Sequence, residues 1–112
     1  MGDDHAALLA AKGENTVLFL YTDNQGKQLQ VVAIRKIETQ LDGKRIPYER
    51  IDGLDPNNKD LRKAMWTISG KPPGTYPIVF IGSKFIADGE SFQELLDSGE
   101  FETAFANVPR SE

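Results

Sequence analysis

Two side chains that commonly carry enzyme chemistry are scarce in this sequence: cysteine is absent and histidine occurs once. It contains no cysteine, so it can form no disulfide, no thiolate metal site and no thiol-based redox centre. Its one histidine, His5, lies close to the N-terminal end, where chains are commonly mobile. We therefore expect no metal site, no resident cofactor and no histidine-activated nucleophile.

Charged side chains form two short clusters that could suggest acid–base catalysis. The first consists of Glu49, Arg50 and Asp52, and the second of Asp60, Arg62 and Lys63. Both fall on the outer faces of a predicted strand and a predicted helix, where solvated charges are the norm. We assign these clusters no chemistry, and we expect a protein that is not an enzyme.

Length and charge narrow the class of protein further. The 112 residues, 39% hydrophobic and 27% charged, are typical of one globular domain. A net charge of -4 with interspersed basic residues argues against nucleic acid and anionic membrane as partners. Asp3 and Asp4 stand where a secretion signal would carry basic residues, and the apolar stretch at 6–11 is too short to span a membrane. We therefore expect a cytoplasmic protein.

The first half of the chain has the pattern of a strand, a helix and a second strand. Residues 16–21 are an apolar run, as in a strand buried on both faces. A stripe at three- and four-residue steps then predicts a helix that ends near Gly43. Its members are Leu29, Val32, Ala33, Ile37 and Leu41. Residues 46–52 form the second strand, which Pro47 restricts to a sheet edge. Such a unit favours parallel strands with a right-handed crossover.

A second helix follows, and it carries the single tryptophan of the sequence. Asp55 and Pro56 supply an N-cap and a first-turn proline, and Gly70 ends the apolar stripe. The stripe consists of Leu61, Ala64, Met65 and Ile68. Trp66 falls off the stripe, so it either packs at the edge of the core or offers a surface to a partner.

The remaining residues predict a hairpin and a final helix. Pro77 opens an apolar strand, and because proline cannot donate to a sheet ladder, we expect a bend with a cis Tyr76–Pro77 bond facing the turn at 25–26. A turn at 82–83 leads to an antiparallel strand at 84–87. Asp88 then caps the last long helix.

The order β-α-β-α-β-β-α, with a proline at the start of the third strand, is that of a thioredoxin-like, or glutaredoxin-like, α/β fold. We expect a three-layer sandwich around a four-stranded mixed sheet. The domain spans residues 16–107, with an N-terminal extension at 1–15 that could be helical and a frayed tail at 108–112. Thioredoxins and glutaredoxins carry a Cys-x-x-Cys after the first strand, whereas residues 22–29 here contain no sulfur.

Several short motifs are more specific than the order of elements. They are residues 41–46, Tyr48, Asp52, Leu61-Arg62, Met65, residues 70–72, Pro77-Ile78 and residues 88–92. Over residues 17–100 the sequence resembles the SH3-domain-binding glutamic-acid-rich-like proteins, which are similar to glutaredoxins without active-site cysteines. The resemblance implies a small cytosolic domain that binds proteins and does not turn over a substrate.

The resemblance also implies where a partner would bind. Founding members of the family carry a proline-rich SH3 ligand before the third strand, but Pro72, Pro73 and Pro77 here lack Pro-x-x-Pro spacing. This argues against an SH3 domain and favours an unidentified protein or peptide in the vestigial active-site groove. The expected groove residues are Asn24, Gln25, Gly26, Lys27, Tyr76, Pro77, Asp88, Gly89, Glu90 and Ser91.

Two other functions stay open on the sequence. One is binding of glutathione or a γ-glutamyl peptide, because the helix start at Asp88 could receive a carboxylate and Lys27 could add a positive charge. Asp88 and Glu90 would oppose such a ligand by repulsion. The other is an enzyme that uses the Thr22 hydroxyl, as glutathione transferases use a hydroxyl, although this chain is too short for their second helical domain.

Overall fold

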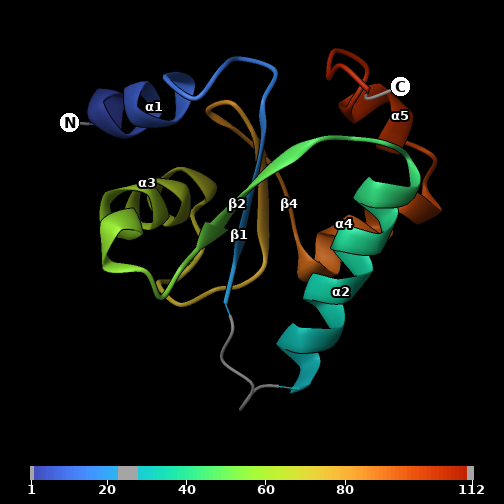
Figure 1. Ribbon diagram of the computed structural model, residues 1–112, viewed down its shortest axis with the longest axis horizontal. Coiled ribbons are helices and arrows are strands. Elements are labelled where there is room, and N and C mark those ends of the chain that lie inside the picture. The colour runs from blue at the N-terminus through green and yellow to red at the C-terminus, as the bar shows by residue number, and fades with distance from the viewer. Residues whose placement is uncertain (1, 23–27, 111–112) are drawn as a thin grey trace.

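The computed structural model describes residues 2–22 and 28–110 (Figure 1). Its helices are α1 Gly2–Ala10, α2 Gln28–Gly43, α3 Lys59–Ser69, α4 Gly89–Asp97 and α5 Phe101–Ala104, and its strands are β1 Val17–Tyr21, β2 Tyr48–Asp52, β3 Ile78–Ile81 and β4 Lys84–Asp88. A 3-10 turn, Pro56–Asn58, precedes α3. Among the described residues, no helix is long and apolar enough to cross a membrane.

The sheet is mixed and has the strand order β2-β1-β3-β4. β1 pairs in parallel with β2, so that Leu20 lies opposite Ile51, and antiparallel with β3, so that Leu20 also lies opposite Ile78. β3 and β4 form the predicted antiparallel hairpin, with an irregularity in register beside Phe80. The central β1, the edge strand β2 and the parallel β-α-β unit are thus confirmed.

Helices cover both faces of the sheet, which gives the predicted three layers: α1 and α3 lie on one side and α2 and α4 on the other (Figure 1). Successive side chains of β1 point to opposite faces. Val17 and Phe19 join the core beneath α2, α4 and α5, whereas Leu18 and Leu20 join the core beneath α1 and α3. All four are fully buried, as expected for an uninterrupted apolar strand.

Local signals set the ends of α3 as the sequence indicates. The carboxylate of Asp55 accepts a hydrogen bond from the N–H of Asn57 at 2.9 Å, and Pro56 starts the 3-10 turn. Gly70 ends α3 in the left-handed region with φ 74°, which a residue without a Cβ adopts at little cost. The predicted cap and stop are therefore confirmed, although the first turn is 3-10 and not α-helical.

The N-terminal segment belongs to the folded body. α1 occupies residues 2–10, and Leu9 is fully buried in the same core as α3. Lys12, just after α1, forms an ion pair of 2.9 Å with Glu49 on the edge strand β2. The sequence left open whether this segment docks, and the burial of Leu9 provides the reason that it does.

Residues 108–110 differ from the frayed tail that the sequence predicts. Val108 is 5% exposed and belongs to the core beneath α5, where Phe101 and Phe105 stack with 4.3 Å between ring centres. Arg110 forms an ion pair of 3.0 Å with Glu102. The segment is held because α5 presents aromatic side chains that need a cover, which a terminal position in the sequence does not reveal.

Candidate functional site

A groove opens where α2, the approach to β3 and the first turn of α4 meet. Its volume is about 420 Å³. The described residues that line it are Gln30, Ala33, Thr75, Tyr76, Pro77, Asp88, Gly89 and Glu90. The groove therefore combines one face of a helix, a backbone segment that precedes a strand, and a helix N-terminus.

The predicted groove residues divide into three groups. Those that line the groove are Tyr76, Pro77, Asp88, Gly89 and Glu90. Ser91 does not line it but completes the cap of α4. Those that lie outside the described residues are Asn24, Gln25, Gly26 and Lys27.

Three residues of the lining were missed from the sequence, namely Gln30, Ala33 and Thr75. Gln30 and Ala33 are three residues apart, so they share one face of α2. That spacing was visible in the sequence. Which neighbour this face meets is decided by the packing of α2 beside α4, and no local pattern indicates it.

The backbone at Tyr76 borders the groove just before β3 begins. The Tyr76–Pro77 bond is cis, as expected from the sequence, and β3 starts only at Ile78. Among the described residues, none forms a backbone hydrogen bond with the N–H or carbonyl of Tyr76. Such a segment offers a donor and an acceptor to an extended peptide. The predicted contact with the turn at 25–26 lies outside the described residues.

The side chain of Tyr76 anchors this backbone to the α3 side of the sheet. Its ring meets Trp66 edge to face, with 5.7 Å between the ring centres and 74° between the planes. The ring also lies against Gly53, where an added Cβ would stand 2.3 Å from the phenol oxygen. Partial burial raises the pKa of Tyr76, and Arg62 acts in the opposite direction. The ring of Tyr76 is therefore held between its contacts with Trp66 and Gly53.

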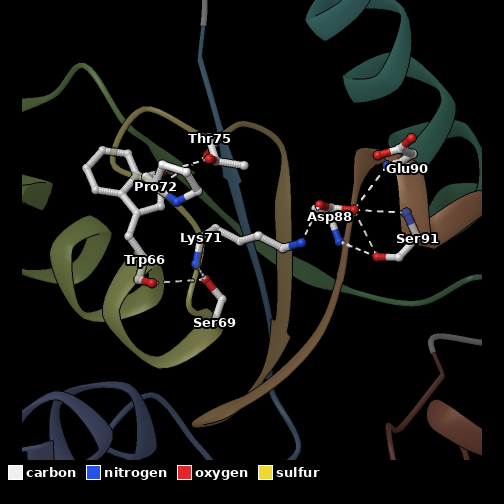
Figure 2. Close-up of polar contacts among 8 residues, drawn as sticks. All are labelled: Trp66, Ser69, Lys71, Pro72, Thr75, Asp88, Glu90 and Ser91. Carbon is white, nitrogen blue, oxygen red and sulfur yellow. Dashed lines mark hydrogen bonds and ion pairs between the residues drawn. The ribbon is translucent and has the colours of Figure 1, made fainter.

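Trp66 connects the second core with the groove. It is half-buried, packs against the core beneath α1 and α3, and donates its indole N–H to the carbonyl of Thr75 at 3.0 Å. Its own carbonyl accepts a hydrogen bond from the Ser69 hydroxyl at 3.1 Å (Figure 2). Of the two interpretations of Trp66, packing at the edge of the core describes its position, while a partner surface there stays a prediction.

Asp88 holds the first turn of α4 together. One carboxylate oxygen accepts hydrogen bonds from the backbone N–H groups of Glu90 and Ser91, at 3.1 and 2.8 Å, and from the Ser91 hydroxyl at 2.9 Å. The N–H of Asp88 donates in turn to the Ser91 hydroxyl at 2.9 Å, which completes a capping box. The ammonium nitrogen of Lys71 lies 3.1 Å from the second carboxylate oxygen of Asp88 (Figure 2).

These contacts determine the charge state of Asp88. Partial burial acts to raise the pKa of its carboxyl group, but hydrogen bonds from Ser91 and Lys71 together outweigh burial and lower it. Asp88 is therefore ionised at neutral pH, with its charge balanced by Lys71. In the described part of the chain, no three His, Asp or Glu side chains gather in a way that could hold a metal ion.

Small residues form the base of the groove. A Cβ added to Gly89 would stand 3.1 Å from the Cβ of Ala33 and 3.2 Å from the Cδ of Pro77. Both distances are tighter than ordinary van der Waals contacts. Glycine at this position therefore lets α4 approach α2 and the proline closely and keeps the space beside them open.

Thr22, which the hydroxyl-based enzyme hypothesis requires, lies elsewhere. It is 5% exposed and lines a separate depression of about 150 Å³ together with Tyr21, Arg35 and Arg50. Thr22 does not line the groove at Tyr76 and Pro77. The geometry of the described residues therefore adds no support for this hypothesis.

Comparisons with known proteins address the fold. Neither a scan of protein-family models nor a search of curated proteins found a match. A mutated buckwheat glutaredoxin matches with a TM-score of 0.67 and 16% identity over 98% of each chain. The holo form of glutaredoxin C1 from Populus tremula x tremuloides matches with a TM-score of 0.66 and 17% identity, over 99% of this chain and 97% of that one. This chain has the glutaredoxin-like thioredoxin fold.

A third solved structure, a buckwheat glutaredoxin–glutathione complex, matches with a TM-score of 0.64 and 17% identity over 96% of this chain and 98% of that one. The glutaredoxin-like chain described here has no cysteine anywhere in its sequence. It therefore has the glutaredoxin-like fold without the thiol that disulfide exchange requires.

Proposed function

We propose that this chain is a non-catalytic glutaredoxin-like protein that binds an extended segment of a partner protein in the groove beside Tyr76. The observation that carries the proposal is the backbone of Tyr76, which pairs with no described residue and borders a groove of about 420 Å³. Main-chain hydrogen bonds to such a segment supply affinity, and the neighbouring pocket supplies specificity.

The resemblance to SH3-domain-binding glutamic-acid-rich-like proteins supports a binding role in the cytoplasm. It does not extend to an SH3 ligand. The carbonyl of Pro72 accepts hydrogen bonds from both the N–H and the hydroxyl of Thr75, at 3.2 and 2.7 Å. The loop therefore closes into a turn, whereas an SH3 domain requires an extended polyproline segment.

Glutathione, the alternative ligand, is less well matched to the groove. A ligand carboxylate at the N-terminus of α4 needs backbone N–H groups that are free to donate. The N–H groups of Glu90 and Ser91 already donate to Asp88. Glutathione would have to displace this internal carboxylate, so the geometry favours a peptide segment without a carboxylate at this point.

The proposal is tested by selecting binders from a displayed library of random heptapeptides and mapping the enriched peptides by backbone amide shifts. We expect shifts at Tyr76, Gly89 and Glu90. Gly89→Ala narrows the base of the groove and should weaken binding by about tenfold, since a misplaced contact in a packed site costs of the order of 1.4 kcal/mol. Gly43→Ala is the matched control, because a Cβ there meets nothing within 4 Å.

Two results would overturn the proposal. The first is that enriched peptides shift amides only outside the groove. The second is that Gly89→Ala and Gly43→Ala, with folding verified by circular dichroism, bind the peptides equally well. A parallel titration with glutathione decides the alternative: shifts at Tyr76, Gly89 and Glu90 would favour glutathione over a peptide.

A further inference from the structure

The described lining of the groove carries charge of one sign only. Asp88 and Glu90 are acidic, Gln30 and Thr75 are neutral polar residues, and none of the described lining residues is basic. Lys71 contacts Asp88 but does not itself line the groove. The two carboxylates differ in their surroundings, and this difference determines what each can do to an incoming chain.

Asp88 is fully engaged by its own protein. One carboxylate oxygen caps α4, and the other lies 3.1 Å from the ammonium of Lys71 (Figure 2). A second carboxylate arriving here would find the N–H groups of Glu90 and Ser91 already occupied. The nearby ammonium of Lys71 is likewise already paired with Asp88. Asp88 therefore acts against acidic ligands and leaves no anion site open.

The carboxylate of Glu90 differs from that of Asp88 in its surroundings. Its side chain is exposed on the first turn of α4, and among the described residues it forms no ion pair. Its backbone N–H donates to Asp88, whereas its carboxylate is not engaged by that hydrogen bond. A cation that lies along the groove beside Pro77 and Gly89 would therefore meet, at the rim, a carboxylate that forms no ion pair with a described residue.

We infer that the groove selects an extended segment that carries a lysine or arginine side chain opposite Glu90 and rejects segments with a carboxylate at that position. The inference rests on the proposed function and adds the chemistry of the partner. The net charge of -4 on the whole chain has the same sign as the Glu90 carboxylate, so it assists the approach of a basic segment.

Three capped peptides test the inference: acetyl-Gly-Ser-Val-Xaa-Val-Ser-Gly-amide with Xaa as lysine, glutamine or glutamate. Amide shifts at Tyr76, Gly89 and Glu90 report binding in the groove, and the fluorescence of Trp66, the single tryptophan, gives the affinity. We expect the lysine peptide to bind about tenfold more tightly than the glutamate peptide, because attraction is replaced by repulsion. Added salt should reduce this ratio.

Substitutions assign the selectivity to individual carboxylates. Glu90→Gln should weaken binding of the lysine peptide by about threefold more than binding of the glutamine peptide, as for an exposed ion pair. Glu94→Gln removes the same charge from an exposed position of α4 outside the groove and should change neither affinity. Asp88→Asn keeps a capping acceptor but removes the charge, and it should strengthen binding of the glutamate peptide.

The outcomes distinguish the charge selection at Glu90 from the proposed function, which is peptide binding in the groove. Equal affinity for the three peptides, with shifts at the groove amides, would overturn the charge selection and leave the proposed function standing. Equal effects of Glu90→Gln and Glu94→Gln would also overturn it. If none of the three peptides shifts a groove amide at millimolar concentration but library-selected peptides do, the charge selection fails and the proposed function stands; if neither set shifts a groove amide, both fail.

Discussion

The ammonium of Lys71 lies 3.1 Å from a carboxylate oxygen of Asp88, and this ion pair joins the loop after α3 to the first turn of α4. Lys71 also stands 5.9 Å from the ring centre of Phe85 on β4. The loop that contains Tyr76 and Pro77 lies between Lys71 and Asp88 in the sequence. The pair therefore fixes two walls of the groove relative to each other.

Replacing Asp88 by alanine should lower the free energy of unfolding by about 1–2 kcal/mol, because the N-cap of α4 is lost together with the ion pair. Urea unfolding followed by circular dichroism measures the change. Asp97→Ala is the control: Asp97 accepts a hydrogen bond from Gln93 on the exposed face of the same helix. A loss at Asp97 as large as that at Asp88 would contradict the assigned capping role.

The contribution of Asp88 to stability should depend on pH in one direction. Its pKa in the folded protein lies below the ordinary value of 3.8, so the contribution is present above that value and is lost as the pH falls through the lowered pKa. Asp88→Asn cannot titrate. The stability difference between the wild type and Asp88→Asn should therefore be constant near neutral pH and shrink below about pH 4. A stability difference between the wild type and Asp88→Asn that grows on acidification would contradict the lowered pKa of Asp88.

Gly53→Ala should disturb the groove from the opposite side of the sheet. An added Cβ would stand 2.3 Å from the phenol oxygen of Tyr76, so the ring must move from its present contact with Trp66. We expect a loss of about 1–3 kcal/mol in the free energy of unfolding, as for overpacking, and a shift in tryptophan emission. Gly43→Ala should produce neither change. Unaltered emission in Gly53→Ala would contradict the described packing of Tyr76.

Tyr48 should titrate at unusually alkaline pH. Burial, the charges of Glu38 and Asp42, and a hydrogen bond of 3.3 Å to Glu38 raise the pKa of Tyr48 to about 12. Absorbance of the phenolate, compared between the wild type and Tyr48→Phe, isolates its transition. Glu38→Gln should lower the pKa of Tyr48 toward 10.0. A Tyr48 transition already at 10.0 in the wild type would contradict this interaction.

The raised pKa of Tyr48 also has a consequence for stability. The neutral phenol is favoured in the folded protein, so its contribution is complete below the unfolded pKa of 10.0 and is lost as the pH rises through about 12. Tyr48→Phe should therefore lose less stability than the wild type over that interval. Equal losses in the two proteins would show that the phenol of Tyr48 does not titrate differently on unfolding.

Val108→Ala should destabilise the fold by about 1–2 kcal/mol, because the side chain is 5% exposed and its removal leaves a cavity beside Phe105. Thermal and urea unfolding measure the effect. Ala106 is exposed two residues earlier, so Ala106→Ser serves as a control with little expected change. If Val108→Ala were as stable as the wild type, the segment at 108–110 would behave as the frayed tail that the sequence predicts.

The sequence by itself determined the features that depend on residues close together in the chain. The apolar run at 16–21 indicated a central strand, and Asp55-Pro56 and Asp88 indicated helix starts, because capping and side-chain alternation involve neighbours within a few residues. The order of these elements, with Pro77 before the third strand, was enough to predict the glutaredoxin-like fold. The absence of cysteine was equally plain from the sequence.

The tertiary structure alone decided the features that join distant segments. Nothing local to Leu9 or Val108 indicates that both are buried, because their covers are supplied by helices elsewhere in the chain. The same holds for Lys71 beside Asp88 and for Ala33 beside Gly89, which together shape the groove. Packing in a folded core is set by the path of the whole chain, and a pattern of neighbouring residues does not specify which distant side chains that path brings into contact.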